Sequence, residues 1–594
     1  MVFLKGAWGE LQDRQPGMMT LISLAITVAF VFSVAVELGF PATALWWELA
    51  TLVTIMLLGH WIEMRSINQA QGALRELAKL LPDKATLVTE EGTKEVTVDE
   101  LNKGDVVLVR PGESVPVDGV IRKGKSALNE AMITGESRPV TKSEGEEVIA
   151  GTNNGEGSLR VEVTGVGDET KLSGIMRLVS EAQESKSRSQ VLADRAAQML
   201  TGVAIAAALI TIVVWQLLDA TIDFTVVRMV TVLVIACPHA LGLAVPLVVA
   251  ISTTMGAKGG LLIRDRHGLE EARNLNAVIF DKTGTLTLGE FRVTDLVAGE
   301  GVSKDEALSI AASIESESEH PIARGIVASA KEQELEYTDA ENFRNITGKG
   351  VAATVNGEEY HLGGPSILKE ENAEVEDELQ QAAERAGERG QTAIYLIQNG
   401  KALAVFAVAD APRKESYEAI RSLHNRGIEV AMLTGDSKAV ANAVAEELNI
   451  DTVFAEVLPE EKASKVKEMQ QQGKIVAMVG DGVNDAPALA TADVGIAIGA
   501  GTDVAVEAGH IVLVRSDPRD IPRIVTLSAA TRNKMLQNLW WAAGYNILAI
   551  PLAAGVAYGW GILLSPAVGA VLMSASTVIV AINAQLLRNV DLSQ

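Results

Sequence analysis

The stretch Asp281-Lys282-Thr283-Gly284-Thr285-Leu286-Thr287 decides the fold, because it directly follows an apolar run at residues 277–280. An aspartate at the carboxyl end of a buried parallel strand, followed by small and hydroxyl residues that can face an anion, suits nucleophilic attack on a phosphate. Taken alone, the string is equally a loop with helix-capping residues. Other segments must therefore decide between the two interpretations.

Three further strings favour the catalytic interpretation. In chain order they are Thr134-Gly135-Glu136-Ser137, Thr434-Gly435-Asp436 and Gly480-Asp481-Gly482-Val483-Asn484-Asp485-Ala486-Pro487. Together with the first string they follow the order used by the P-type ATPases, and the chain resembles this family over nearly its whole length. The resemblance implies an enzyme that uses ATP and Mg²⁺ and forms an aspartyl phosphate.

Six apolar stretches are long enough to cross a bilayer, which needs about 20 helical residues. They lie at about residues 18–36, 43–62, 200–218, 226–253, 539–558 and 562–586, in a chain that is 48% hydrophobic. Basic residues flank one side of these spans: Arg65, Lys258, Arg264, Arg532, Lys534 and Arg588. The short opposite connections carry Glu37, Asp219 and Asp223. The positive-inside rule therefore predicts a multi-pass protein of the cell membrane, with both termini and both large polar inserts in the cytoplasm.

The charge and the cysteine content exclude two classes of protein. A net charge of −25 argues against nucleic acid as a partner, because phosphate binding needs a basic face. Cys237 is the single cysteine, so the chain has no internal disulfide framework.

The expected fold is an α-helical transmembrane bundle with a β-rich actuator domain and an α/β haloacid-dehalogenase-like phosphorylation domain, which carries an inserted α+β nucleotide-binding domain. The resemblance implies these boundaries: transmembrane helices at 1–65, 191–257 and 533–594, the actuator domain at 66–190, the phosphorylation domain at 258–288 and 404–532, and the nucleotide-binding domain at 289–403.

The first insert has strand-like runs at residues 106–109 and 159–163, broken by Gly and Pro, which is typical of a small β-rich unit. By resemblance it is the actuator domain. Glu136 in its Thr-Gly-Glu-Ser string is expected to orient a water against the aspartyl phosphate.

The second insert alternates helical patterns with strand-like runs at residues 278–280, 404–409, 429–433, 475–479 and 495–498. This alternation predicts a doubly wound parallel sheet with its ligand site at the carboxyl ends of the strands. Asp281, Thr434 and Asp481 each follow such a run. We therefore expect the three motifs to converge at one edge.

The chemistry of the converging residues predicts their roles. Asp281 is the expected nucleophile, and Asp281, Asp481 and Asp485 are expected to hold Mg²⁺. Lys462 would neutralise the transferring phosphoryl group, and Thr434 would hydrogen-bond its oxygens. The remaining members of the predicted catalytic set are Lys282, Thr283, Gly435 and Asp436.

Residues 288–403 contain Ser318-Glu319-His320-Pro321 and Gly348-Lys349-Gly350-Val351. These strings resemble the nucleotide-binding domain of heavy-metal P-type ATPases, which implies an adenine pocket at Glu319, His320, Gly348 and Gly350. At 363–365 this chain has Gly-Gly-Pro where related pumps often have Gly-Asn. These residues are therefore left out of the predicted site.

Cys237-Pro238-His239 lies in the middle of the fourth span. Pro238 has no N–H and its ring collides with the Val234 carbonyl, so the helix must open and free a backbone oxygen. A lone buried cysteine is usually a small hydrophobe, but a histidine at this depth is rare and generally functional. The thiol and the imidazole together predict a transition-metal site.

The last two spans would place Tyr545, Asn546, Met573 and Ser574 at a comparable depth. Thiolate and thioether with imidazole favour copper, and silver by its similar softness. The third to sixth spans have no Asp or Glu in their interiors, whereas hard cations want carboxylate oxygen. This composition argues against a calcium, proton or sodium-potassium pump.

The chain thus resembles the Cys-Pro-His, or CopB-type, branch of the heavy-metal P-type ATPases, which implies ATP-driven copper export. His239 replaces the second cysteine of the more familiar Cys-Pro-Cys, which leaves Cu⁺ and Cu²⁺ as alternatives. Met18, Glu63 and Asp194 match a cytoplasmic metal-uptake site of related pumps. The alternative is that the two carboxylates are ordinary charges at the membrane interface and that Met18 belongs to the apolar core. Pumps of this branch usually have two more helices and a metal-binding tail before the first span, and this sequence begins without them. Two explanations stay open: a shortened chain, or a natural short form.

Two other functions remain as alternatives at this point. One is a membrane-tethered haloacid-dehalogenase-like phosphatase without transport, and the other is a metal receptor that binds ATP only for signalling. Copper-dependent ATP turnover and a covalent aspartyl phosphate distinguish the pump from both. The sequence does not identify a copper donor protein.

Overall fold

The computed structural model describes residues 2–70, 82, 84–89, 92–130, 139–174, 176–177, 188–316, 318, 320–346, 349–436, 438–481, 483–499 and 507–592. The chain forms two compact units. One combines Met1–Arg273 with Thr526–Gln594, and the other is Asn274–Val525.

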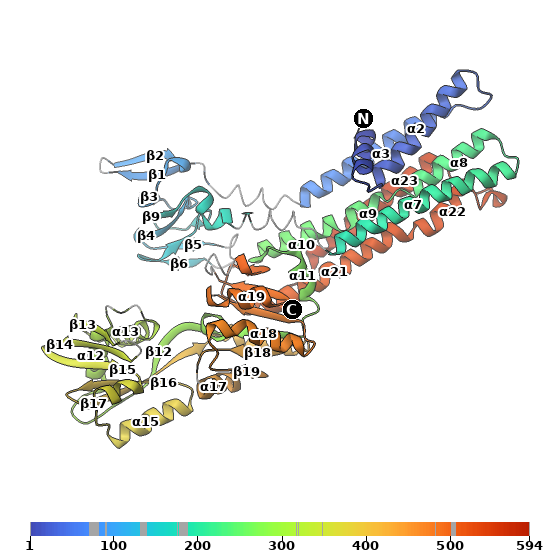
Figure 1. Cartoon of the computed structure of the whole chain (residues 1–594). Coiled ribbons are helices and arrows are strands. Elements are labelled where there is room, and N and C mark those ends of the chain that lie inside the picture. Colours follow the sequence, from blue (N-terminus) through green and yellow to red (C-terminus); the bar gives the residue numbers. More distant parts are fainter. Residues whose placement is uncertain are drawn as a thin grey trace. The chain divides into compact units, whose positions relative to one another are not determined.

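Long helices dominate the first unit (Figure 1). Its helices, long and short, are in chain order α1 (Val2–Gln12), α2 (Met18–Glu37), α3 (Trp46–Ala70), α7 (Arg188–Leu217), α8 (Ile222–Ile235), α9 (His239–Ala244), α10 (Pro246–Lys258), α11 (Arg266–Ala272), α21 (Asp520–Gly544, which begins in the second unit), α22 (Asn546–Ala554) and α23 (Pro566–Gln585). Four stretches within the described residues are helical, long and apolar enough to cross a membrane: Met18–Glu37, Ser189–Leu217, Ile222–Lys258 and Pro566–Asn589.

The second and fifth expected spans differ from this pattern for identifiable reasons. Helix α3 is long, but it carries Glu48, Glu63 and Arg65, which lower its hydropathy. The expected span at 539–558 is divided at Tyr545 into α21 and the short α22, which contains Pro551. An apolar run in the sequence therefore does not ensure one continuous helix.

The helix opens at Pro238 as the sequence predicts. Helix α8 ends at Ile235 and α9 begins at His239. The His239 N–H donates to the Cys237 carbonyl at 2.8 Å instead of to the carbonyl four residues before it, which an unbroken helix would use. The break places Cys237 and His239 on irregular backbone inside the bundle, where both are buried.

A β-rich region follows α3 in the chain. One sheet has the order β2-β1-β3-β9-β4-β7 and a smaller one the order β6-β5-β8. The strands are β1 (Lys84–Thr89), β2 (Gly92–Thr97), β3 (Val106–Val109), β4 (Asp118–Lys123), β5 (Ser126–Asn129), β6 (Val140–Lys142), β7 (Glu147–Val148), β8 (Asn153–Asn154) and β9 (Leu159–Gly165). Alternate residues of β3 and β9 are buried, because one face of the sheet covers an apolar core.

The second unit contains a parallel sheet with the strand order β22-β21-β20-β11-β18-β19. Its strands are β11 (Ala277–Asp281), β18 (Glu429–Leu433), β19 (Thr452–Phe454), β20 (Val476–Gly480), β21 (Val494–Ile498) and β22 (Ile511–Leu513). Helices alternate with these strands along the chain: α16 (Lys414–His424), α17 (Lys438–Leu448), α18 (Lys462–Gln471) and α19 (Ala486–Thr491). Strand β11 pairs with both β18 and β20, so the three strands end side by side.

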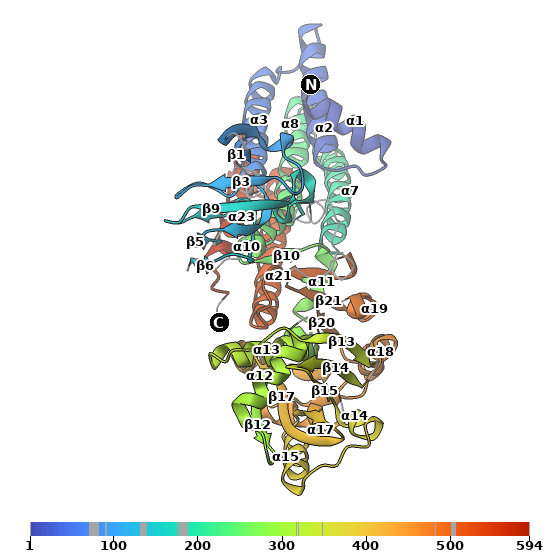
Figure 2. The same ribbon diagram turned by 90° about the vertical axis from the view of Figure 1, so that its left-hand side faces the viewer.

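An antiparallel sheet of six strands is inserted after β11 and has the order β12-β17-β16-β15-β14-β13 (Figures 1 and 2). The strands are β12 (Thr287–Ala298), β13 (Glu341–Ile346), β14 (Gly350–Val355), β15 (Glu358–Gly363), β16 (Thr392–Gln398) and β17 (Lys401–Pro412). Helices α12 (Lys304–Glu315) and α13 (Pro321–Glu332) pack on it, and α14 (Pro365–Glu370) and α15 (Asp377–Glu388) complete the insert.

One strand assignment made from the sequence is wrong. The run at 404–409 was expected in the parallel sheet, but it lies in β17, which pairs antiparallel with β12 and β16. The expected boundary between residues 403 and 404 therefore cuts through a strand of the inserted sheet. A strand covered on both faces is a continuous apolar run in either kind of sheet, so periodicity could not separate them.

Candidate functional site

Asp281 ends strand β11 and is 8% exposed. The following turn, η3 (Lys282–Leu286), changes direction at Gly284, whose φ is +75°. A Cβ on Gly284 would lie 2.4 Å from Asp481 Oδ2. Glycine is therefore required here for its backbone conformation and for the close approach of the aspartate.

Lys462, the first residue of α18, joins two of the predicted carboxylates. Its Nζ lies 2.5 Å from Asp281 Oδ1 and 2.7 Å from Asp485 Oδ1. Burial lowers the pKa of Lys462, but the two carboxylates more than offset this effect and raise it overall. The lysine thus stays charged beside the predicted nucleophile.

The predicted threonine and the motif lysine meet at a third carboxylate. Lys282 Nζ is 2.6 Å from Asp436 Oδ2, and the Thr434 hydroxyl donates to the same oxygen at 2.9 Å. The Asp436 N–H donates back to Thr434 Oγ1 at 3.1 Å. Thr283 and Gly435 are exposed. The ends of β11 and β18 thus present a connected polar surface.

Asp485 approaches from the loop after β20. A Cβ on Gly480 would lie 2.5 Å from Asp485 Oδ2, so this glycine lets the buried carboxylate pass close to the strand end. Burial, together with the charge of Asp485, raises the pKa of both Asp281 and Asp481. Burial and the repulsion between neighbouring carboxylates thus both disfavour the charged forms of Asp281 and Asp481.

This donor set fits Mg²⁺, because Asp281, Asp481 and Asp485 supply hard oxygen ligands. The Lys462 ammonium group contacts two of these carboxylates, those of Asp281 and Asp485. In the described part of the chain no three His, Cys, Asp or Glu side chains are already arranged to hold a metal ion. The aspartates are therefore gathered in one place but do not form a finished coordination sphere.

Some predicted residues lie outside the described part of the chain. They are Thr134, Gly135, Glu136 and Ser137 of the first insert, with Glu319, Gly348 and Gly482 of the second.

The inserted sheet contains a cavity of about 710 Å³ lined by His320 and Gly350, two of the four residues predicted for adenine. His320 also caps α13, because its Nδ1 accepts from the Ile322 N–H at 3.3 Å. Phe343, Ile346 and Ile394 supply apolar wall. A cavity that combines apolar walls with polar side chains is typical of a site for a small ligand.

The prediction from sequence missed further lining residues of this cavity. Gly363 and Gly364 line it, although they were left out of the predicted site. Gly363 is the register partner of Gly350, and a Cβ on Gly363 would lie 2.3 Å from the Lys349 carbonyl oxygen. Glu315 also lines the cavity, and burial raises its pKa. Glu315 lies five residues before His320 in the sequence, and this short spacing is the signal that could have placed it in the cavity.

Cys237 and His239 share one neighbour in the helix bundle. Cys237 Sγ donates to the Met18 carbonyl oxygen at 3.7 Å, and His239 Nδ1 faces Met18 Sδ. The Glu10 carboxylate holds the start of α2 by accepting from Gly17 N, Met19 N and Thr20 N. The amino end of α2 favours this negative charge, and Met18 is fixed next to the break in the helix.

The other ring nitrogen of His239 faces a carboxylate. His239 Nε2 is 3.5 Å from Glu63 Oε2, and the same oxygen is 3.1 Å from His60 Nδ1. Met18 and Glu63, two members of the predicted uptake site, both contact His239. Asp194, the third residue of that set, is exposed on α7. The structure therefore brings Met18 and Glu63 together with the Cys-Pro-His motif, and the uptake role of the three residues stays a prediction.

The residues predicted from the last two spans lie in different relations to the pair. A Cβ on Gly59 would lie 3.1 Å from Ser574 Oγ and 3.7 Å from His239 Nε2, so Ser574 is close to the imidazole. Met573 is buried in the same apolar cluster as Cys237. Tyr545 donates its hydroxyl to the Ile235 carbonyl at 3.0 Å, and Asn546 donates to the Ala542 carbonyl at 3.3 Å.

Comparison with known families agrees with the domain assignment of both polar inserts. The sequence model of the haloacid dehalogenase-like hydrolases matches residues 275–493, which contain Asp281 and the parallel sheet. The model of the P-type ATPase actuator domain matches residues 79–180, which contain the β-rich region.

Relatives and a solved structure match along nearly the whole chain. The copper-exporting P-type ATPase B of Archaeoglobus fulgidus is 57% identical over 586 residues, which are 99% of this chain and 84% of the relative. The probable copper-transporting P-type ATPase B of Staphylococcus aureus is 45% identical, with coverages of 98% and 87%. The crystal structure of a zinc-transporting PIB-type ATPase in an E2.Pi state matches with a TM-score of 0.65, 30% identity and coverages of 98% and 92%. The chain therefore belongs to the P-type ATPases, in their CopB-type branch.

Proposed function

We propose that this chain exports copper from the cytoplasm, driven by ATP through a phosphate on Asp281. One observation carries the proposal. A buried thiol, imidazole and carboxylate meet a partly buried thioether at a break in a membrane helix, in the same chain as a nucleophilic aspartate paired with a lysine. The names of the relatives from A. fulgidus and S. aureus support copper as the cargo.

The phosphoryl transfer follows from the groups around Asp281. Its carboxylate oxygen attacks the γ-phosphorus of ATP, the new P–O bond forms, and the bond to the β–γ bridging oxygen breaks so that ADP leaves with the electron pair. Lys462 balances negative charge on the transferred group. Mg²⁺ held by Asp281, Asp481 and Asp485 would draw electron density from the phosphoryl oxygens.

Adenine binding is assigned to the cavity of the inserted sheet. Gly350 and Gly363 keep its floor free of side chains, while His320 and Glu315 offer polar edges. Phe343 and Ile394 supply the apolar contact that a flat base needs. Glu319 and Gly348 stay part of the proposed pocket on the family resemblance.

The membrane ligand set is proposed to be Cys237, His239, Met18 and Glu63, with Ser574 and Met573 next to it. Thiol and thioether favour Cu⁺ and Ag⁺, whereas imidazole and carboxylate also suit Cu²⁺. The other candidates have backbone partners: the Tyr545 hydroxyl and the Asn546 amide each donate to a carbonyl. Asp194 remains a candidate for metal uptake at the cytoplasmic end of α7.

The orientation and the reset of the pump are also proposals. The charge pattern of the connections supports cytoplasmic termini and cytoplasmic inserts. After the metal leaves on the outside, Glu136 is proposed to activate the water that hydrolyses the aspartyl phosphate.

The experiment that tests the proposal is ATPase activity of the purified full chain with Cu⁺, Cu²⁺, Ag⁺, Zn²⁺ and Cd²⁺ under defined redox conditions. Copper or silver should stimulate turnover, and Cys237→Ala should abolish the stimulation because it removes the thiol. His239→Cys should keep the Cu⁺ or Ag⁺ response and lower any Cu²⁺ response. Turnover that ignores every metal would indicate a phosphatase without transport.

A further inference from the structure

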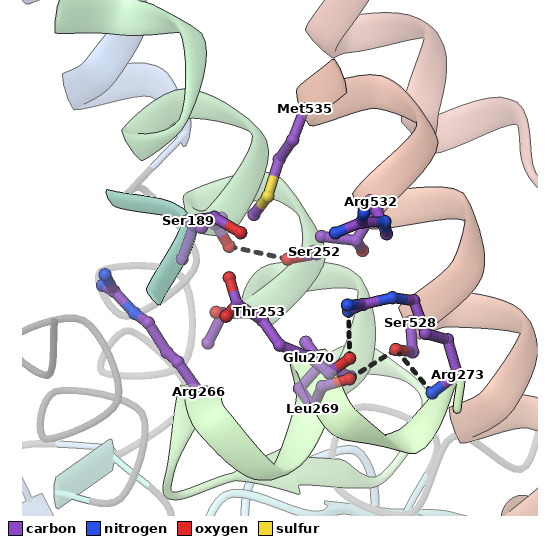
Figure 3. Close-up of a pocket in the computed structure, with 12 residues that line it drawn as sticks. Ser189, Ser252, Thr253, Arg266, Leu269, Glu270, Arg273, Ser528, Arg532 and Met535 are labelled. Carbon is purple, nitrogen blue, oxygen red and sulfur yellow. Dashed lines mark hydrogen bonds between the residues drawn. The ribbon is translucent and has the colours of Figure 1, made fainter. Parts of the chain in front are cut away.

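A second pocket lies in the first unit, among α7, α10, α11 and α21, and it contains none of the residues assigned above (Figure 3). It is located where α10 ends and where α21 rejoins the unit, which the charge pattern places at the cytoplasmic face of the membrane. Three arginines and one glutamate line it, beside several hydroxyl side chains and three apolar ones. Nothing in the copper cycle accounts for this composition.

Two hydroxyl groups in the pocket are buried and unpaired. Thr253 is 1% exposed and Thr531 is 4% exposed, and neither Oγ1 has a hydrogen-bond partner among the described residues. Figure 3 shows Thr253 among the residues that line the pocket. Buried hydroxyl groups are normally hydrogen-bonded, so these two are free to donate to an acceptor that enters the pocket.

Two guanidinium groups stand on one side of the pocket. Arg273 donates through Nη1 to the Glu270 carbonyl, and the exposed Arg532 lies nearby on α21. Burial and then the charge of Arg532 lower the pKa of Arg273, while Glu270 and Glu271 oppose this effect. The third arginine, Arg266, extends to the far side in Figure 3. The positive charge of the pair is thus only partly compensated.

The size of the pocket limits what can enter. Its enclosed part is about 20 Å³, room for one oxygen atom of a larger group. The rest of such a group would lie at the mouth beside Arg532. Val249 and Met535 add apolar wall, which fits the glycerol and acyl region of a lipid better than a free ion.

We propose that this pocket binds the phosphate group of an anionic phospholipid from the cytoplasmic leaflet. One phosphate oxygen accepts from Thr253 and Thr531, and the others face Arg273 and Arg532. Basic pockets between membrane helices on this side commonly hold such headgroups, and guanidinium groups match phosphate geometry.

Binding there would link two crossings of the chain. Arg273 is the last residue of the first unit before the chain enters the second, and Arg532 follows soon after the chain returns at Thr526. A phosphate bound by Arg273 and Arg532 would therefore contact both chain segments that connect the first unit to the second. Through this shared contact, we expect anionic lipid to raise the rate of ATP turnover.

The test uses the full chain in nanodiscs of phosphatidylcholine alone or of phosphatidylcholine with phosphatidylglycerol. Native mass spectrometry measures retained lipid, and ATPase assays measure turnover. Wild type should retain phosphatidylglycerol selectively, and Arg273→Gln with Arg532→Gln should weaken retention about tenfold or more, because two charge-assisted contacts are lost. Arg588→Gln, at an exposed arginine of η7 (Leu586–Asn589) outside the pocket, should behave as wild type. Thr253→Val should weaken retention without changing charge.

Two results would overturn the lipid assignment. Equal retention by wild type and the double variant, with both proteins folded by thermal unfolding, would exclude the pocket. The second result has two parts. Phosphatidylglycerol has no effect, and inorganic phosphate, at constant ionic strength and in neutral lipid, protects the wild type but not the double variant from thermal unfolding. The pocket would then bind free phosphate.

Discussion

Tyr545 donates its hydroxyl to the backbone carbonyl of Ile235 at 3.0 Å, and so satisfies the oxygen that the break at Pro238 releases. In an unbroken helix the N–H of His239 would fill this role, but it donates to the Cys237 carbonyl. The tyrosine therefore stabilises the opened form of the helix that carries Cys237 and His239.

Tyr545→Phe should destabilise the protein by about 0.5–2 kcal/mol, because the Ile235 carbonyl loses its donor inside the bundle. Copper stoichiometry should stay the same, since the hydroxyl is not a ligand. Thermal unfolding and metal analysis of the purified protein check both points. Tyr558→Phe, in the ring cluster with Trp215 and Phe224, is the matched control. Lost copper with unchanged stability would make Tyr545 a ligand after all.

Asp281→Asn should abolish the phosphoenzyme and transport while ATP still binds. An amide keeps the shape of the side chain but cannot attack phosphorus. Labelling with γ-phosphate-labelled ATP, followed by an acid quench, measures the intermediate. Labelled phosphate that still accumulates on the variant would refute the assignment of the nucleophile.

Glu136→Gln should have the opposite effect on the same assay. The aspartyl phosphate should form at a normal rate and persist, because the water that hydrolyses it is poorly activated. A chase with unlabelled ATP measures its decay. A normal decay rate would mean that another group activates the water.

Glu63→Gln should weaken copper binding by about 10–100-fold, the usual cost of removing a group that orients a metal-binding histidine or binds beside it. The effect is expected because Glu63 Oε2 lies 3.5 Å from His239 Nε2. Asp194→Asn, at an exposed position on α7, should leave the equilibrium affinity unchanged. Competition titration with a copper chelator compares them, and equal losses would restore Asp194 to the same site.

Gly363→Ala should reduce ATP affinity several-fold. The new Cβ would lie 2.3 Å from the Lys349 carbonyl oxygen, so the paired strands β14 and β15 must separate beneath the cavity. Gly387→Ala, in α15 and outside the residues that line the cavity, is the matched control, because its Cβ would meet nothing within 4 Å. Calorimetric titration of each variant with ATP tests the contrast, and equal affinities would remove Gly363 from the binding floor.

The fold class and the convergence around Asp281 could be predicted because the signal is local. Each motif directly follows a short apolar run, and parallel strands β11, β18 and β20 bring their carboxyl ends together by topology. The run at 404–409 has the same local signal but belongs to the inserted sheet. Apolarity records burial, whereas the choice of strand partner depends on residues far away in the sequence.

The grouping of the membrane ligands could not be predicted for the same reason. Met18 and His239 are far apart in the chain, and their contact depends on how α2 packs against α8 and α9. The residue after Gly363 departs from the family pattern, so the motif does not predict a role for this glycine, which depends on its register with Gly350. A motif therefore predicts the chemical role of a residue, whereas its neighbours in space depend on how the helices and strands pack.

The pairing of Thr287 with Pro412 has a consequence for evolution and engineering. The nucleotide insert leaves the parallel sheet and returns to it at adjacent backbone positions, and Arg413 fastens the junction by donating to the carbonyls of Thr287 and Gly284 at 2.8 and 3.1 Å. With respect to the parallel sheet, residues 288–411 therefore act as one long loop whose two ends are held together by the pairing of Thr287 with Pro412. Each doubling of such a loop costs only about 0.6 kcal/mol. The catalytic sheet can therefore accept inserts of very different size, or exchange them, without moving Asp281.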